Sequence, residues 1–193
     1  MNRKTRESEQ GFTIFEIAAV FLVGGVIMAF ATPRITNAMR AYRINIATRQ
    51  VVDTLKRVKT QAVSENKRAA FVVDTANRQA GLATLNTDGT VKNTSYINLP
   101  QGIVFQRPSV STNPAGVSSS LTTAVSFSQY GSTGSVYKQD FNTRGFPVVA
   151  NGTDTICIFV GNGKEYRAIT MSSVGGIRLY KLDGTTWTDM RCP

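Results

Sequence analysis

The apolar and polar positions of the chain follow three successive patterns, and the first is an apolar run over 12–31 directly after a short polar leader. A helix that crosses the hydrocarbon core of a membrane needs about 20 such residues. The run therefore predicts a leader over 1–11 and a transmembrane segment over 12–33. Glu16 is the one charged residue within that run.

A helical period follows the apolar run. From residue 34 to residue 68, apolar side chains recur at three-and-four spacing, with arginine and lysine on the other faces. This pattern predicts an amphipathic stem helix over 34–68 that continues the transmembrane helix. Pro33 lacks a backbone donor, so we expect a kink at Pro33 within a combined helix of about 55 residues. The lower half of the stem should bury one face against a domain.

After residue 68 the period changes to two, which predicts a β-rich head domain over 69–193. Its strands are expected at 69–74, 80–85, 90–98, 103–106, 122–128, 136–141, 154–160, 165–172 and 175–182. The stretch 107–120 is rich in serine, proline, glycine and threonine, which predicts a mobile surface loop or a boundary between two sheets. We therefore expect an α+β fold, with the long N-terminal helix packed on antiparallel strands in two sheets.

The charge of the chain changes one part of this picture. The net charge is +10, but residues 34–68 have nine basic residues against two acidic ones, whereas 69–193 have ten against seven. The excess basicity therefore belongs mainly to the stem. A solvated face near anionic lipid or neighbouring subunits is the favoured interpretation, and a nucleic-acid groove is the alternative. Basic residues flank the apolar run on both sides, so charge alone leaves the membrane orientation open.

The sequence offers little catalytic chemistry. The chain has no histidine, which removes the commonest general base and metal ligand. Five aspartates fall at expected strand ends or turns, where turn formation explains them: Asp74, Asp88, Asp154, Asp183 and Asp189. Gly161-Asn-Gly-Lys164 lacks the frame of a phosphate loop and predicts a hairpin turn. We expect no enzyme, cofactor or metal site. A membrane-tethered enzyme is the remote alternative and would need a pocket of convergent polar groups.

Two cysteines, Cys157 and Cys192, are the only ones in the chain. If the head lies outside the cytoplasm, we expect them to form a disulfide that ties the last residues to a strand. The alternative is two unpaired small core residues.

The segment Gly11-Phe12-Thr-Ile-Phe-Glu16, followed by an apolar helix with Pro33 near its end, resembles the processing site of type IV pilin-like proteins, including the pseudopilins of type II secretion. The resemblance implies cleavage by a prepilin peptidase between Gly11 and Phe12, followed by methylation of the new Phe12 amine. It also implies a single-pass protein of the bacterial inner membrane, with a cytoplasmic N-terminus and a periplasmic head. After assembly the protein would be associated with a filament.

Later landmarks narrow the resemblance. The segments 55–73, 99–104 and 141–147 resemble the H-type pseudopilin and FimT/FimU-type minor pilin family, strongly near the N-terminus and loosely beyond residue 107. This resemblance implies a structural subunit that initiates or caps a type II secretion pseudopilus or a type IV pilus. Its partners would be other pilins or pseudopilins and the lipid of the inner membrane.

DNA uptake is the alternative function within that family. DNA-binding members share a Gly-Arg-x-Arg element near the C-terminus, whereas this chain has Gly176-Ile-Arg-Leu-Tyr-Lys181. Nucleic-acid binding would require a surface cluster of basic residues: Arg107, Arg144, Arg167, Arg178 and Lys181. The neighbouring Gly145 is most simply explained by a tight turn.

Glu16 is the residue that most needs a partner. Insertion scales assign a charge at a helix centre a cost of roughly 2.5–3.5 kcal/mol, and less near the helix end. One interpretation is that its carboxylate reaches the membrane interface. The favoured hypothesis is that it pairs with the Phe12 amine freed by processing. That amine can come from the same helix, where the two residues are four apart, or from a neighbouring subunit. Glu16 would then couple processing to assembly.

Overall fold

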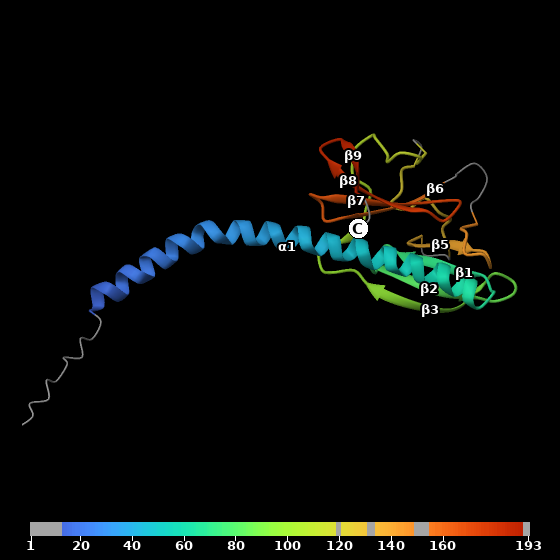
Figure 1. Ribbon diagram of the computed structural model, residues 1–193, viewed down its shortest axis with the longest axis horizontal. Coiled ribbons are helices and arrows are strands. Elements are labelled where there is room, and N and C mark those ends of the chain that lie inside the picture. The colour runs from blue at the N-terminus through green and yellow to red at the C-terminus, as the bar shows by residue number, and fades with distance from the viewer. Residues whose placement is uncertain (1–12, 119–120, 131–133, 149–154, 191–193) are drawn as a thin grey trace, which may run out of the picture. The chain divides into compact units, whose positions relative to one another are not determined.

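The structure is a computed structural model that describes residues 13–118, 121–130, 134–148 and 155–190 (Figure 1). Among these residues it contains one helix followed by nine strands. The chain divides into two units, Met1–Met39 and Arg40–Pro193. The helix α1, Ile14–Ser64, is 51 residues long and contributes to both units.

The part of α1 that belongs to the first unit is apolar and exposed. Twelve large apolar side chains from residue 14 to residue 35 are more than 45% exposed, among them Phe15 at 83% and Phe21 at 75%. α1 is the one helix in the described part of the chain that is long and apolar enough to cross a membrane. The helix continues through Pro33, as expected. The kink at Pro33 stays a prediction.

The part of α1 that belongs to the second unit buries one face. The buried positions recur every three or four residues: Ile44, Ala47, Thr48, Val51, Val52, Thr54, Leu55, Val58 and Ala62. The helix ends at Ser64 because Asn66 adopts a left-handed backbone conformation with φ of 49°. The Lys67 N–H then donates to the Ala62 carbonyl over 3.2 Å. The prediction that the stem helix continues to residue 68 was therefore wrong by four residues.

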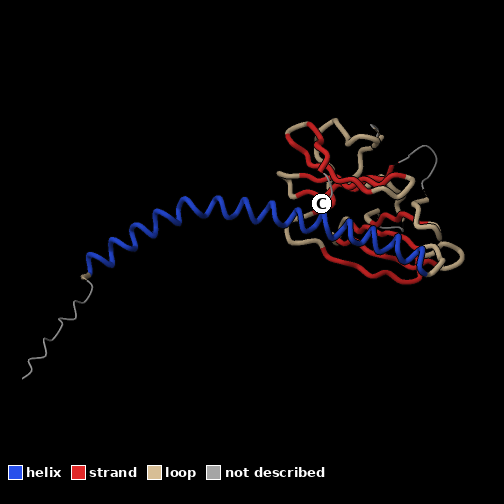
Figure 2. Tube along the Cα trace, viewed as in Figure 1, coloured by secondary structure: helices blue, strands red, loops and turns tan. Residues whose placement is uncertain are grey.

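The strands form two antiparallel sheets (Figures 1 and 2). The first sheet has the order β3-β2-β1-β5, with β1 at Ala69–Asp74, β2 at Gln79–Leu85, β3 at Val91–Asn98 and β5 at Val136–Phe141. The second has the order β4-β6-β7-β8-β9, with β4 at Val104–Phe105, β6 at Thr155–Gly161, β7 at Tyr166–Ser172, β8 at Ile177–Asp183 and β9 at Thr186–Met190. The predicted α+β class with two antiparallel sheets is confirmed.

One hydrophobic core joins the second half of α1 to both sheets. On β1, Phe71 and alternate neighbours belong to the same core cluster as Leu55 of the helix, and Ile158 of β6 belongs to it as well. The alternate residues of β6, Cys157 and Phe159, lie on the other face of their sheet, in a smaller cluster. This period of two explains why both sheets bury apolar side chains on the helix side.

The strand predicted at 122–128 was wrong. This segment makes only isolated contacts with β6, such as the bridge between Val125 and Ile158. Its polar side chains replace backbone partners: the Ser126 hydroxyl accepts from the Cys157 N–H over 2.6 Å, and the Thr123 hydroxyl donates to the Val125 carbonyl. Such local bonds compete with a regular ladder of backbone hydrogen bonds.

Strand β9 was missed. It pairs with β8 through a tight turn, with Asp183 opposite Thr186 and Gly184 at a φ of 63°. Asp189, expected at a strand end or turn, lies within β9 opposite Tyr180. The strand escaped prediction because only Trp187 and Met190 among its five residues are apolar.

Candidate functional site

The first candidate site is the start of α1, where Thr13 and Glu16 bind each other. The Glu16 Oε2 atom accepts from the Thr13 N–H over 2.9 Å and from the Thr13 hydroxyl over 3.0 Å. In return, the Glu16 N–H donates to the Thr13 hydroxyl over 3.3 Å. This reciprocal arrangement is a capping box, which satisfies donors that every helix leaves unpaired at its first turn.

The capping box holds the Glu16 carboxylate at the beginning of the helix. Both bonds use Oε2, so Oε1 remains open to a further donor. The N-terminal end of a helix also stabilises a negative charge through the aligned peptide dipoles. The Thr-x-x-Glu spacing was a sequence signal for this cap that the sequence analysis did not use. Gly11 and Phe12 lie outside the described residues, so their processing stays a prediction.

The apolar side chains near Glu16 on α1 are exposed within the described part of the chain. Ile17, Val20 and Phe21 are 48%, 71% and 75% exposed. In the described residues, Thr13 is the one residue that hydrogen-bonds to the Glu16 side chain.

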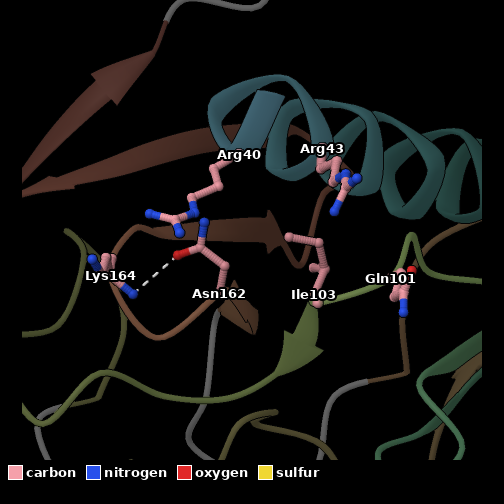
Figure 3. Close-up of a pocket in the computed structure, with 7 residues that line it drawn as sticks. Arg40, Arg43, Gln101, Ile103, Asn162 and Lys164 are labelled. Carbon is pink, nitrogen blue, oxygen red and sulfur yellow. Dashed lines mark hydrogen bonds between the residues drawn. The ribbon is translucent and has the colours of Figure 1, made fainter. Parts of the chain in front are cut away.

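A second candidate site is a basic cavity of about 270 Å³ within the second unit. Arg40 and Arg43 of α1 stand on one side of it, and Lys164, Asn162 and Gln101 stand on the other, with Ile103 between (Figure 3). In the sequence, Arg40 and Arg43 belong to a generally basic stem, and Lys164 belongs to a predicted turn. Only the tertiary structure brings these residues together.

Two turns build the far side of this cavity. Asn162 closes the turn between β6 and β7, because its Oδ1 accepts from the N–H groups of Lys164 over 3.0 Å and Glu165 over 2.7 Å. This confirms the hairpin turn expected at 161–164. The other turn includes Gln101 and leads into β4, which pairs with β6. The pairing holds the two turns next to each other.

The five basic residues needed for the nucleic-acid hypothesis do not share one surface. Arg167 is only 4% exposed. Its guanidinium lies 3.6 Å from the Glu165 carboxylate and donates to the Asn45 side chain over 3.5 Å. Burial lowers the pKa of Arg167, an effect that the Glu165 charge opposes. Arg167 is therefore part of the packing between β7 and the helix.

Two of the other four basic residues lie on opposite faces of one sheet. Arg178 and Lys181 are three positions apart on β8 and therefore point to opposite faces of the sheet. Lys181 pairs with Asp183 over 2.6 Å, and their hydrogen bond lowers the pKa of that carboxyl. Arg107 is half-buried and donates to Asn113 over 3.0 Å, whereas Arg144 is exposed in a turn.

Cys157 lies in β6 and is fully buried. Burial raises the pKa of its thiol far above the ordinary value, so an unpaired thiol would stay protonated. Cys192 lies outside the described residues, and the disulfide stays a prediction. In the described part of the chain, no three histidine, cysteine, aspartate or glutamate side chains come together in a way that suits a metal ion.

Comparisons with known proteins add little to this geometry. No protein-family model matches the chain, and no curated protein matches it. The solved structure of the minor pseudopilin EpsH from the type 2 secretion system of Vibrio cholerae has a TM-score of 0.46 and a sequence identity of 12%. The match covers 71% of this chain and 95% of that one. At these values the likeness carries no functional argument by itself.

Proposed function

We propose that this chain is a minor pseudopilin or minor pilin, a structural subunit that initiates or caps a filament of type II secretion or type IV pili. The observation that carries the proposal is the position of Glu16: a carboxylate within the first turn of a long exposed apolar helix, five residues after Gly11. A charge retained in such a segment is a candidate for a functional contact.

The proposed sequence of events begins with processing. A prepilin peptidase cuts between Gly11 and Phe12, the leader 1–11 is removed, and the Phe12 amine is methylated. The capping bonds of Glu16 come from Thr13, which lies after the cut. The carboxylate can therefore keep its cap in the processed chain and still use Oε1 to receive the new amine.

The exposed apolar half of α1 supports the rest of the proposal. It anchors the subunit in the bacterial inner membrane, with the N-terminus in the cytoplasm and the head in the periplasm. On assembly, the same side chains exchange lipid contacts for contacts with neighbouring pilins. A pair between Glu16 and a Phe12 amine of the next subunit would then neutralise both charges in a low-dielectric environment, where an unpaired charge is costly.

Three variants of the full chain separate an assembly role from a capping role. Thr13→Ala removes the two hydrogen bonds of the Thr13 hydroxyl and leaves the charge and the bond from the residue 13 N–H. Glu16→Ala removes the carboxylate with both of its capping bonds, and Glu16→Gln keeps a side-chain acceptor without the charge. We expect filament incorporation to be lost in both Glu16 variants and largely kept in Thr13→Ala. Mass spectrometry of the mature N-terminus would show whether each variant is cut and methylated.

The results for these variants distinguish an assembly role of Glu16 from a capping role. Equal loss of assembly in Thr13→Ala and Glu16→Ala would mean that Glu16 acts only as a helix cap. Normal assembly of Glu16→Gln would show that the negative charge is dispensable, and the proposal would fail.

A further inference from the structure

We propose that the basic cavity formed by Arg40, Arg43 and Lys164 binds a phosphate group, supplied by the headgroup of an anionic phospholipid. The inference rests on the membrane anchor of the proposed function. It assigns a specific lipid contact to the head of the protein, which a general attraction between a basic stem and a membrane would not require.

The first argument is the position of the two arginines on the helix. The buried stripe of α1 begins with Ile44 and Ala47, both fully buried. Arg40 and Arg43 stand four residues before these two, on the same face. One turn earlier, the stripe therefore changes from apolar side chains to guanidinium groups, and these line a cavity with residues of the head.

The second argument is that the cavity has positive charge and, among the residues that the structure describes, no acidic side chain paired with it. The side chains of Arg40, Arg43 and Lys164 make no hydrogen bond or ion pair within the described residues. The sequence has no acidic residue between Glu16 and Asp53. Glu165, next to the cavity in sequence, lies 3.6 Å from Arg167. Several unpaired cations around one cavity favour an external anion.

The third argument concerns the shape of the anion. Arginine has a planar fork of donors that suits phosphate oxygens, and lysine adds a point charge. Asn162 is fixed by its turn, where its Oδ1 is occupied by backbone donors, so its amide nitrogen is left as a further donor toward the cavity (Figure 3). The apolar side chain of Ile103 lies between the polar groups, where it can contact the non-polar part of a headgroup.

The fourth argument selects a lipid as the source. Arg40 and Arg43 follow Pro33, the end of the predicted span, by only seven and ten residues in the sequence. The headgroup layer of a leaflet extends roughly 5–8 Å beyond the hydrocarbon core. Basic residues this soon after a span are suited to anionic headgroups at the membrane surface. The place of the two arginines in the sequence therefore favours a lipid phosphate over a soluble anion.

The experiment uses the full chain, purified in a neutral detergent and examined by native mass spectrometry with added lipid. We expect wild type to retain phosphatidylglycerol in preference to phosphatidylcholine. The double variant Arg40→Gln/Arg43→Gln should weaken the apparent affinity for phosphatidylglycerol about tenfold. The matched control, Lys56→Gln/Arg57→Gln, removes the same charge from exposed positions on the same helix outside the cavity and should leave retention unchanged.

Two further measurements test whether the bound anion is a lipid phosphate or free phosphate. A single variant, Lys164→Gln, should also reduce retention, because this residue belongs to the head and not to the helix. Inorganic phosphate at millimolar concentration should not displace the lipid. If it does, the site binds free phosphate and the lipid assignment is overturned.

The remaining outcomes also decide the matter. Equal losses in the two double variants would reduce the effect to general charge and overturn the site. If Arg40→Gln/Arg43→Gln retained lipid normally but lost filament assembly, the lipid proposal would be overturned. The cavity would then bind a carboxylate of a neighbouring subunit. Failure of the proposed function is distinguishable: Glu16→Gln would then assemble normally while lipid retention still depends on Arg40 and Arg43.

Discussion

The two halves of α1 differ both in apolar pattern and in environment. Leu22 in the first half is 69% exposed, whereas Leu55 in the second half is fully buried against the two sheets. The continuous apolar run of the first half leaves no polar face, whereas the three-and-four spacing of the second half gives one face for a protein core and another for water. The second half stabilises the head of its own chain, and on our proposal the first half contacts lipid and other subunits.

The same substitution in both halves of α1 tests whether only the second half stabilises the head. Leu55→Ala should lower the free energy of unfolding of the head by about 2–5 kcal/mol, because it removes buried methyl groups and leaves a cavity. Leu22→Ala should change the same quantity by less than about 0.5 kcal/mol. Denaturant unfolding of the full chain in detergent, followed by the fluorescence of Trp187, measures both. A comparable loss in the two variants would contradict the division of the helix.

Glycine substitutions test whether a turn of the head packs closely against the second half of α1. Gly145 has a φ of 75°, and an added Cβ would lie 2.8 Å from Lys59 Cγ and 2.9 Å from Val63 Cγ2 on the second half of α1. Gly145→Ala should therefore lower head stability by about 1–3 kcal/mol, the usual cost of a strained residue, with the close contacts placing it at the upper end.

Two controls separate the causes of that loss. Gly102 has a φ of 82° but open space around an added Cβ, so Gly102→Ala tests the backbone conformation alone. Gly25, in the first half of α1, has nothing within 4 Å of an added Cβ, and Gly25→Ala should leave head stability unchanged. If Gly145→Ala matched Gly25→Ala, the close approach of the turn to the helix would be refuted.

The sequence predicted individual helices and strands better than the contacts between them. The three-and-four spacing of α1 and the alternation in β1 and β6 were sufficient to place these elements, because one buried face imposes its period on the sequence. The same reasoning failed at 122–128, where Ser126 provides a hydroxyl in place of a backbone partner. It also failed at β9, whose mostly exposed residues carry little apolar signal.

The candidate sites divide in the same way. Glu16 was evident from the sequence because a charge in an apolar run stands out, and the Thr13 cap was available as a local spacing. The cavity of Arg40, Arg43 and Lys164 was not predictable, since it depends on which turn meets which part of the helix. That contact is set by strand pairing between β4 and β6, far from the helix in sequence.

The smallest expected effect concerns an exposed ion pair at the end of α1. Arg68, just after α1, lies 2.9 Å from the Asp140 carboxylate, which also lies 3.2 Å from Lys138 Nζ. The Arg68 side chain is 47% exposed, so water and salt screen the pair. Arg68→Ala should cost 0–1 kcal/mol of head stability, the range of exposed ion pairs, and the cost should shrink at 1 M salt. Arg34→Ala removes the same charge from the first half, where no described residue pairs with it, and should have no effect on the head.

A loss above about 2 kcal/mol in Arg68→Ala, unchanged by salt, would show that the junction between helix and first strand depends on a desolvated ion pair. The stability of the head would then rest less on the apolar face of α1 than the contrast between Leu55 and Leu22 implies.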